Sequence, residues 1–260
     1  MKIFDEIWYS MQAGYRINLQ DAIDHYCKTG KNRNINPSPY FDTNWYARAA
    51  GLSLDEVRNP LEHFERFGAV SLCDPHPLFN SKFYKWNYIR DPGSEAVPLI
   101  HYIEEGWRND ARPHPLFWGD WYRKRYMDEI GDINPLYHFI SEGERSDFNP
   151  NPLFDVKWYR NKYHLTSDES ALANYIYGGH DRRDPHPLFD SGYYRSLVTC
   201  RGISPLEHYL TQATDIDPCI LFDAEHVRSQ CRALSGGSDT LAAPALLGYL
   251  VHPQNDAIDP

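Results

Sequence analysis

The sequence predicts an all-α protein, a solenoid of about seven helix-turn-helix repeats of 33–38 residues with proline-rich extended linkers. A block that reads Phe-Asp-x-x-Trp-Tyr, then Pro-Leu-x-His-Tyr, Gly and Pro-x-Pro, recurs along all 260 residues. Its opening residues are Phe4, Phe41, Phe79, Phe117, Phe154, Phe189 and Phe222. A fixed period of this size is typical of stacked supersecondary units. We therefore predict one domain over residues 1–260, with units starting near 4, 41, 79, 117, 154, 189 and 222.

The first element of each unit is predicted to be a helix of about two to three turns. In the second unit Asp42 is a good N-cap, because its carboxylate can accept hydrogen bonds from the first free N–H groups. Phe41 and Tyr46 then occupy the two positions that pair as a hydrophobic staple. The helix is expected to end near Gly51.

The second element is predicted to be a shorter amphipathic helix that begins at Pro60, where the missing proline N–H costs nothing. Leu61, Phe64 and Phe67 are spaced to share one face of this helix. Gly68 suits the left-handed position that follows a last helical turn. Helices this short are unstable alone, so neighbouring units are expected to stack.

Alternating prolines in the segment 74–77 predict an extended crossing to the next unit. The last unit is degraded: Phe222 has no Trp-Tyr pair after it, and Ser235-Gly236-Gly237-Ser238 loosens the following turn. We expect this unit to cap the array or to fray.

Charge and composition exclude several classes of partner. The chain has 26 basic and 36 acidic residues, for a net charge of −10, which disfavours nucleic acid and anionic membranes as main partners. No stretch approaches the length of apolar sequence that a membrane-spanning helix needs. The five cysteines occupy unmatched repeat positions without a CxxC, and no signal peptide is visible, so we predict a cytoplasmic protein with reduced thiols.

One histidine position recurs inside the second helix of the units. It is occupied by His25, His63, His101, His138 and His208, with Asn174 and Gly248 as exceptions. These residues are either a ladder of metal ligands or acid–base groups, or rings packed between repeats with one nitrogen bonded to a backbone carbonyl. Copies one repeat apart lie too far apart to share one metal, and Asn174 keeps a polar group there, so we favour the packing role. We predict buried histidines, no metal and no cofactor.

Residues that break the repeat are the candidates for a binding surface. Trp86, Trp107 and Trp118 lie in the third and fourth units, and Arg108 and Arg112 lie near them in sequence. Trp118 replaces the residue that caps the first helix elsewhere. These side chains either fill gaps in the core or offer rings to a sugar or a partner protein. The binding hypothesis is that Trp107, Trp118 and Arg108 line one exposed groove.

The pattern also resembles a known family. Residues 184–190, which read Asp-Pro-His-Pro-Leu-Phe-Asp, residues 205–209 and residues 98–108 are similar to tandem repeats found beside glycosyltransferase domains in bacterial polysaccharide-biosynthesis proteins. The resemblance covers essentially the whole chain. It implies a non-catalytic module that serves cell-surface glycan synthesis and binds a partner enzyme or the growing polysaccharide. A fold alone carries no activity, so two alternatives stay open: a protein-interaction scaffold unrelated to glycans, and an enzyme of unrecognised type.

Overall fold

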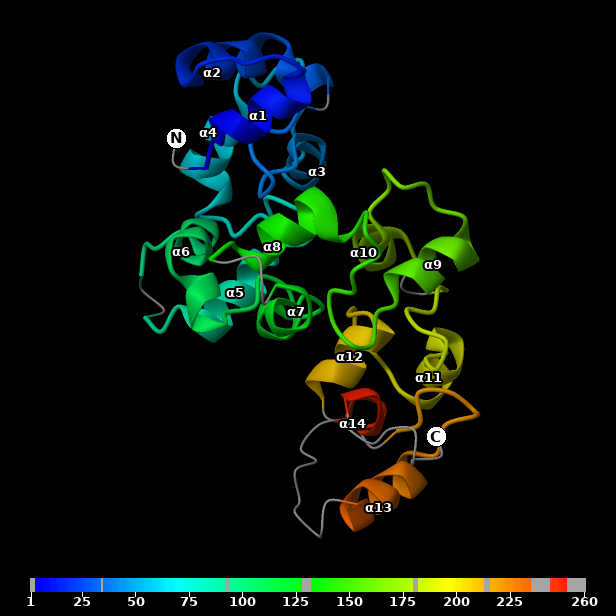
Figure 1. Cartoon of the computed structure of the whole chain (residues 1–260). Helices are drawn as coiled ribbons and strands as arrows, with labels where there is room; N and C mark the ends of the chain where they lie inside the picture. Colours follow the sequence, from blue (N-terminus) through cyan, green and yellow to red (C-terminus); the bar gives the residue numbers. More distant parts are fainter. Residues whose placement is uncertain are drawn as a thin grey trace. The chain divides into compact units, whose positions relative to one another are not determined.

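The computed structural model of the chain describes residues 3–33, 35–91, 94–127, 132–179, 182–212, 216–234 and 244–251. Over these residues the fold is all-α, with fourteen α-helices and no β-strand beyond isolated bridges (Figure 1). The predicted fold class is therefore confirmed at this level.

The helices follow one another in pairs, each with one helix from either half of a sequence unit. The pairs are α1 (Glu6–Ala13) with α2 (Leu19–Lys28), α3 (Thr43–Ala49) with α4 (Pro60–His63), α5 (Ser81–Tyr88) with α6 (Pro98–Glu104), α7 (Gly119–Tyr126) with α8 (Pro135–His138), α9 (Val156–Tyr163) with α10 (Ala171–Asn174), α11 (Ser191–Leu197) with α12 (Pro205–Thr211), and α13 (Ala224–Leu234) with α14 (Ala245–Val251). Within most pairs the two helices pack directly on each other. The segment 235–238, expected to loosen the last unit, lies outside the described residues.

The chain divides into two compact units. The first comprises Met1–Arg123 and Met127–Ser141, and the second comprises Lys124–Tyr126 and Glu142–Pro260. In the first unit, helix α8 of the fourth pair contacts helix α1 of the first pair. The centre of the Tyr137 ring in α8 lies 6.1 Å from that of Trp8 in α1. Tyr40, in the linker before α3, lies 6.2 Å from the same tyrosine.

The first helix of each pair is built as the sequence predicts. Asp42 accepts a hydrogen bond of 2.8 Å from the backbone N–H of Trp45, and the Phe41 and Tyr46 rings lie 5.1 Å apart. Asp5, Asn80, Asp155, Asp190 and Asp223 cap their helices in the same way. The other staples have ring distances between 5.1 and 5.6 Å: Phe4–Tyr9, Phe79–Tyr84, Phe117–Tyr122, Phe154–Tyr159 and Phe189–Tyr194.

The second helix of three pairs departs from the prediction, because it widens into a π-helical turn. These turns are η2 (Phe64–Gly68), η4 (Phe139–Gly143) and η5 (Tyr175–Gly179). In η2 the N–H of Ala69 donates to the carbonyl of Phe64 at 2.8 Å, a spacing of five residues. The extra residue rotates the following side chains around the helix axis. Leu61 and Phe64 are buried, but Phe67 is 56% exposed, so its predicted place on their face is wrong.

The linkers tie consecutive pairs together through backbone hydrogen bonds. The N–H of the capping residue Asp42 donates to the carbonyl of Pro75 in the next linker at 2.9 Å. Four further bonds of this kind measure 2.9–3.0 Å: Asp5 to Pro37, Asn80 to Pro113, Asp155 to Pro185 and Asp190 to Pro218. These five helix starts are therefore fixed both by a side-chain cap and by the linker that follows.

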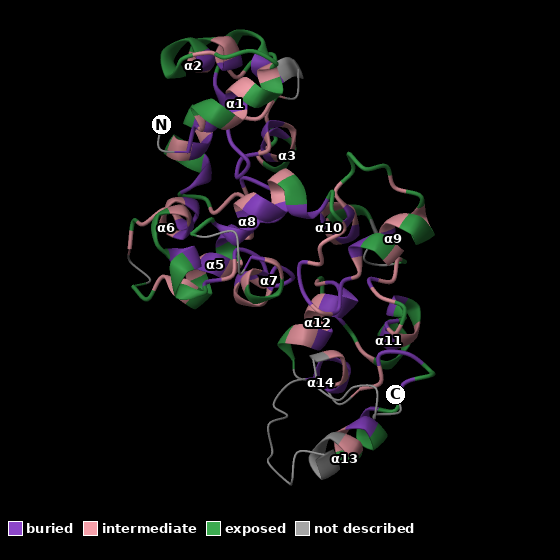
Figure 2. Ribbon diagram, in the orientation of Figure 1, coloured by how far each residue is buried: buried purple, intermediate pink, exposed green. Residues whose placement is uncertain are grey.

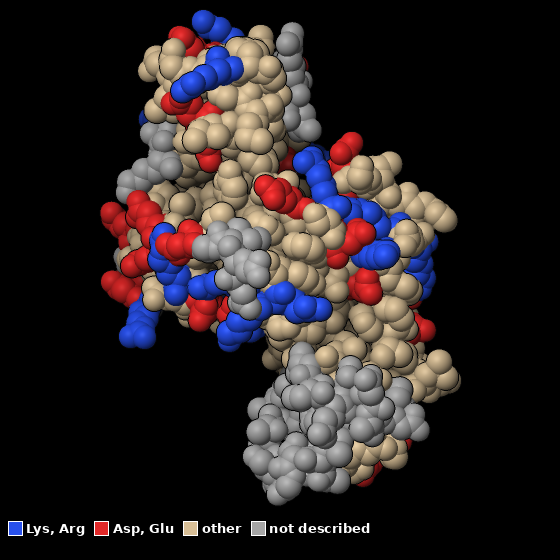
Figure 3. Space-filling view, viewed as in Figure 1, with Lys and Arg blue, Asp and Glu red and all other residues tan. Residues whose placement is uncertain are grey.

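Aromatic rings are the largest side chains in the core of both units. The largest fully buried side chains are tyrosines and phenylalanines from both helices of the pairs, and Figure 2 shows buried segments running through each unit. On the face shown in Figure 3, acidic and basic side chains are intermixed. No helix in the described parts of the chain is long and apolar enough to cross a membrane.

Candidate functional site

The recurring histidine accepts a hydrogen bond from the tyrosine of the preceding helix. The hydroxyl oxygen lies 2.7–2.9 Å from the histidine Nδ1 in five pairs: Tyr9–His25, Tyr46–His63, Tyr84–His101, Tyr122–His138 and Tyr194–His208. Where the histidine is missing, Tyr159 donates to Asn174 Oδ1 at 2.9 Å. Burial raises the pKa of tyrosines such as Tyr46 and Tyr84, so the hydroxyl keeps its proton and donates it.

Two expectations about these histidines are corrected. Their partner is a tyrosine hydroxyl, where a backbone carbonyl was expected. Only His138 is buried, whereas His25, His63, His101 and His208 are half-buried.

A glycine lies five residues after the histidine, and the tyrosine that bonds the histidine leaves no room there for a side chain. A Cβ atom on Gly106 would lie 1.9 Å from the Tyr84 hydroxyl, and one on Gly68 would lie 2.3 Å from that of Tyr46. The predicted left-handed conformation of Gly68 is wrong. Positive φ angles occur four residues later, at Leu72, Asp110 and Asp147.

The residue after this glycine is buried in four units, although its chemistry differs in each: Lys31, Ala69, Trp107 and Glu144. The Lys31 ammonium donates to the carbonyls of Leu54 and Val57. The Glu144 carboxylate accepts from the N–H of Leu172 at 2.9 Å and from the Ser170 hydroxyl at 3.0 Å. Each charged side chain therefore reaches the following helix pair, at the connection between that pair's two helices or at the start of its second helix.

A second set of histidines, which the packing analysis of the sequence missed, lies in the linkers. The Nδ1 atoms of His76, His114 and His186 accept the N–H two residues ahead at 3.0–3.1 Å. Burial lowers their pKa values, to about 4 for His76 and His186 and about 3 for His114. Ser38 and Asn151 accept the same bond in other linkers. Histidine, serine and asparagine side chains can all accept a hydrogen bond. A side-chain acceptor at this linker position is therefore the sequence signal for the turn.

Trp107 does not line an exposed groove. It is 5% exposed, and its indole N–H donates to the carbonyl of Ile103 at 3.1 Å. The guanidinium of Arg108 lies 4.1 Å from the centre of its ring, and that of Arg123 lies 5.9 Å away. Arg108 also pairs with Asp132 at 3.1 Å. Of the two roles considered for Trp107, filling a gap in the core and forming a binding surface, the structure therefore shows the first.

Trp118 and Arg112 pack against each other at the start of α7. Their guanidinium-to-ring distance is 4.2 Å, and the half-buried Trp118 gives no side-chain cap to the helix. Asp120 lies 3.8 Å from the Arg112 guanidinium. Trp86, in α5, is 74% exposed. The contacts of the five proposed binding residues therefore form two separate local clusters, with Trp86 apart from both, and a binding role for Trp118 stays a prediction.

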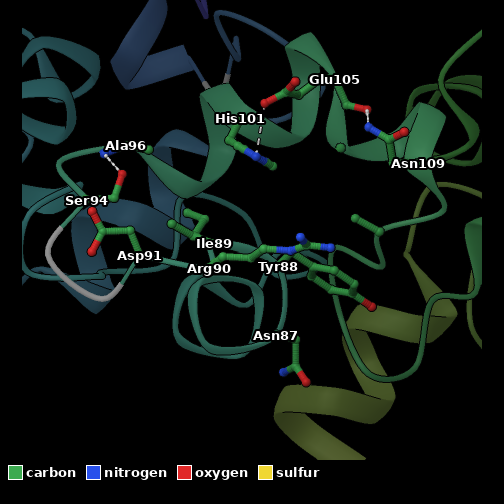
Figure 4. Close-up of a pocket in the computed structure, with 12 residues that line it drawn as sticks. Asn87, Tyr88, Ile89, Arg90, Asp91, Ser94, Ala96, His101, Glu105 and Asn109 are labelled. Carbon is green, nitrogen blue, oxygen red and sulfur yellow. Dashed lines mark hydrogen bonds and ion pairs between the residues drawn. The ribbon is translucent and has the colours of Figure 1, made fainter.

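Two pockets contain the recurring histidine instead. One, of about 610 Å³, is lined by His101 together with Tyr88, Arg90 and Glu105. Figure 4 shows the His101 ring pointing into this pocket. The other, of about 520 Å³, is lined by His208 with Arg201 and Gln212. Within the described ranges, no three His, Cys, Asp or Glu residues are grouped so that they could hold a metal ion.

Comparison with known proteins gives no relative. No protein-family model, no curated protein and no solved structure matches the chain.

Proposed function

We propose that the chain is a non-catalytic helical-repeat module, a solenoid of seven helix pairs forming one domain over residues 1–260. In this proposal it serves bacterial surface-polysaccharide synthesis in the cytoplasm, by binding a glycosyltransferase partner or its glycan. The solenoid arrangement is supported by five repeated linker bonds, such as Asp42 to Pro75 and Asp190 to Pro218, which join a helix start to the linker that follows it.

One observation carries the non-catalytic part of the proposal. Eight of the twelve histidines, the residues best suited to act as acids, bases or metal ligands, recur in equivalent places and form hydrogen bonds within the fold. Five histidines accept a tyrosine hydrogen bond inside their helix pair. Three more close linker turns. A residue needed by each unit's packing is a poor candidate for a single reaction centre. Repeat arrays bind partners along extended surfaces.

The link to glycosyltransferases comes from the sequence resemblance and has a direct test. The chain is co-expressed with the glycosyltransferase encoded nearest to its gene, and the mixture is analysed by affinity purification and size exclusion. We expect a stable complex and an altered rate or product length of transfer. Absence of both effects would contradict the association with that transferase. Turnover of a sugar nucleotide by the purified chain alone would contradict the non-catalytic proposal.

A further inference from the structure

The outer side of the recurring histidine is covered in some helix pairs. In the first pair, the Tyr15 ring lies edge-on to His25 at 6.1 Å. In the second pair, the Phe67 ring lies 5.1 Å from the His63 ring. In the fifth pair, the Arg183 guanidinium donates to Asn174 at 2.5 Å and packs over Tyr163. Side chains of the unit itself therefore occupy the space beside this position.

The same space is open in the third and sixth pairs, where the pockets at His101 and His208 lie. The cause is visible in the sequence. The position of Tyr15, six residues after the bonded tyrosine, is Arg90 in the third pair and Cys200 in the sixth. The position of Phe67, four residues after the histidine, is Glu105 in the third pair and Gln212 in the sixth. Both pairs thus lack the covering ring and carry polar side chains at these positions or beside them.

The pocket at His101 is lined by some polar groups that form hydrogen bonds within the fold and by others that do not. The His101 Nε2 atom lies 3.1 Å from Glu105 Oε1, and the imidazole is held from behind by Tyr84. Among the described residues, neither the Tyr88 hydroxyl nor the Arg90 guanidinium has a hydrogen-bond or ion-pair partner. In other pairs the corresponding hydroxyl is used: that of Tyr163 accepts the N–H of Asp184 at 2.7 Å. Figure 4 shows His101 facing Arg90 and Tyr88 across the pocket.

Comparing the two pockets selects the class of ligand. Arg90, Asp91 and Glu105 give the first pocket a net charge of about −1, whereas Arg201 alone gives the second about +1. An ion of either sign suits only one of them. Both pockets combine a guanidinium donor with a carboxylate or amide acceptor beside the histidine. Hydroxyl groups, which donate and accept, match such a set without net charge.

We propose that the pockets at His101 and His208 each bind a neutral saccharide unit. The volumes of about 610 and 520 Å³ lie in the range of small-molecule sites, roughly 300–1,000 Å³. Tyr88 in one pocket and Val198 in the other supply an apolar wall for the C–H face of a sugar ring. The inference rests on the proposed function, since it makes glycan the ligand of the module.

The test introduces into each pocket, by substitution, an aromatic ring like Tyr15 or Phe67, which covers the histidine in another pair. Arg90→Tyr copies the first pair and Gln212→Phe copies the second. The full-length chain and its variants are titrated with neutral mono- and disaccharides (glucose, galactose, mannose, N-acetylglucosamine and their β-linked dimers), and binding is followed by saturation-transfer NMR. Inorganic phosphate and lysine methyl ester serve as charged probes. Arg48→Tyr, at an exposed position outside both pockets, is the matched control.

We expect each covering substitution to weaken sugar binding at its own site by at least about tenfold, and the control to leave it within roughly twofold. Arg90→Ala, which removes a donor at an exposed position, should also weaken the first site and keeps the test valid if Arg90→Tyr unfolds. Binding of no neutral sugar, binding of charged probes only, or sugar binding that survives both covering substitutions would overturn the proposal. A transferase complex that persists without sugar binding would leave the proposed function intact and remove only this inference.

Discussion

Lys31 and Glu144 occupy the same place in two helix pairs and have opposite charges. Both directly follow the glycine that lies five residues after the recurring histidine, and both are buried, at 6% and 7% exposure. Lys31 faces backbone carbonyls of the next connection, whereas Glu144 faces N–H groups at the next helix start. The required charge is therefore set by whether the neighbour presents acceptors or donors.

The comparison also explains why the repeat looks irregular at this position. Trp107 and Ala69 fill the same place with apolar atoms. The pattern requires burial and a fit to the neighbour, and it leaves the chemistry free. A sequence search for identical residues would therefore overlook a position that is buried in four of the units.

Reversing one of the two charges should have the largest effect. Glu144→Lys would place an ammonium against the N–H of Leu172 and remove the acceptor for Ser170. We expect the free energy of unfolding to fall by about 3–5 kcal/mol, the cost of an unpaired buried charge. Urea denaturation measures it. Glu144→Gln, which keeps one acceptor oxygen, should lose much less, and equal losses in the two variants would contradict the role assigned to the charge.

The glycine before these buried residues allows a comparison between a crowded and an uncrowded glycine. Gly106→Ala would drive a methyl group into the Tyr84 hydroxyl and should cost about 1–3 kcal/mol. Gly178→Ala, at an exposed helical glycine four residues after Asn174 where a Cβ meets nothing within 4 Å, is the control and should be nearly neutral. Thermal and urea unfolding report both. Tyr84→Phe combined with Gly106→Ala should recover part of the loss, and a strictly additive double variant would argue against the contact.

The linker histidines should make stability depend on pH. Their folded pKa values lie below the ordinary value of 6.5, to about 3 for His114. Protons therefore bind the unfolded chain first, and stability falls as pH falls from 6.5 towards 4. His114→Asn, which places the Asn151 type of acceptor in this linker, should remove about 2 kcal/mol of the loss between pH 6.5 and 5. Urea unfolding at both pH values measures this, and an unchanged pH slope would show that His114 does not titrate as assigned.

The smallest expected effect compares two helix starts. Asp42 caps α3, whereas Trp118 gives α7 no side-chain cap. Trp118→Asp should restore the cap and add up to about 1 kcal/mol, less any lost packing on Arg112. Asp42→Ala should lose about 1 kcal/mol. Melting temperatures at fixed pH report both, and a Trp118→Asp variant that melts far below the native chain would identify the indole as an essential part of the core.

The helix starts were determined by the sequence alone. The Asp42 cap and the Phe41–Tyr46 staple span five residues or fewer, and such local hydrogen bonds and contacts repeat wherever the motif repeats. The all-α class followed from the same local signals. The period of the motif also identified the recurring histidine position, although it did not identify the partner.

Only the tertiary structure decided what the histidine, the glycine and the variable residues do. Tyr84 meets His101 across 17 residues, and Glu144 meets Leu172 across 28. The sequence pattern did not predict which face of the second helix is buried. The π-helical turn places Phe67 on the surface, where the pattern had placed it in the core. The burial of Trp107 and the open space beside His101 likewise depend on which side chains of other segments fill the gaps. The physical reason is that burial is set by contacts between segments far apart along the chain, and a local pattern does not specify those contacts.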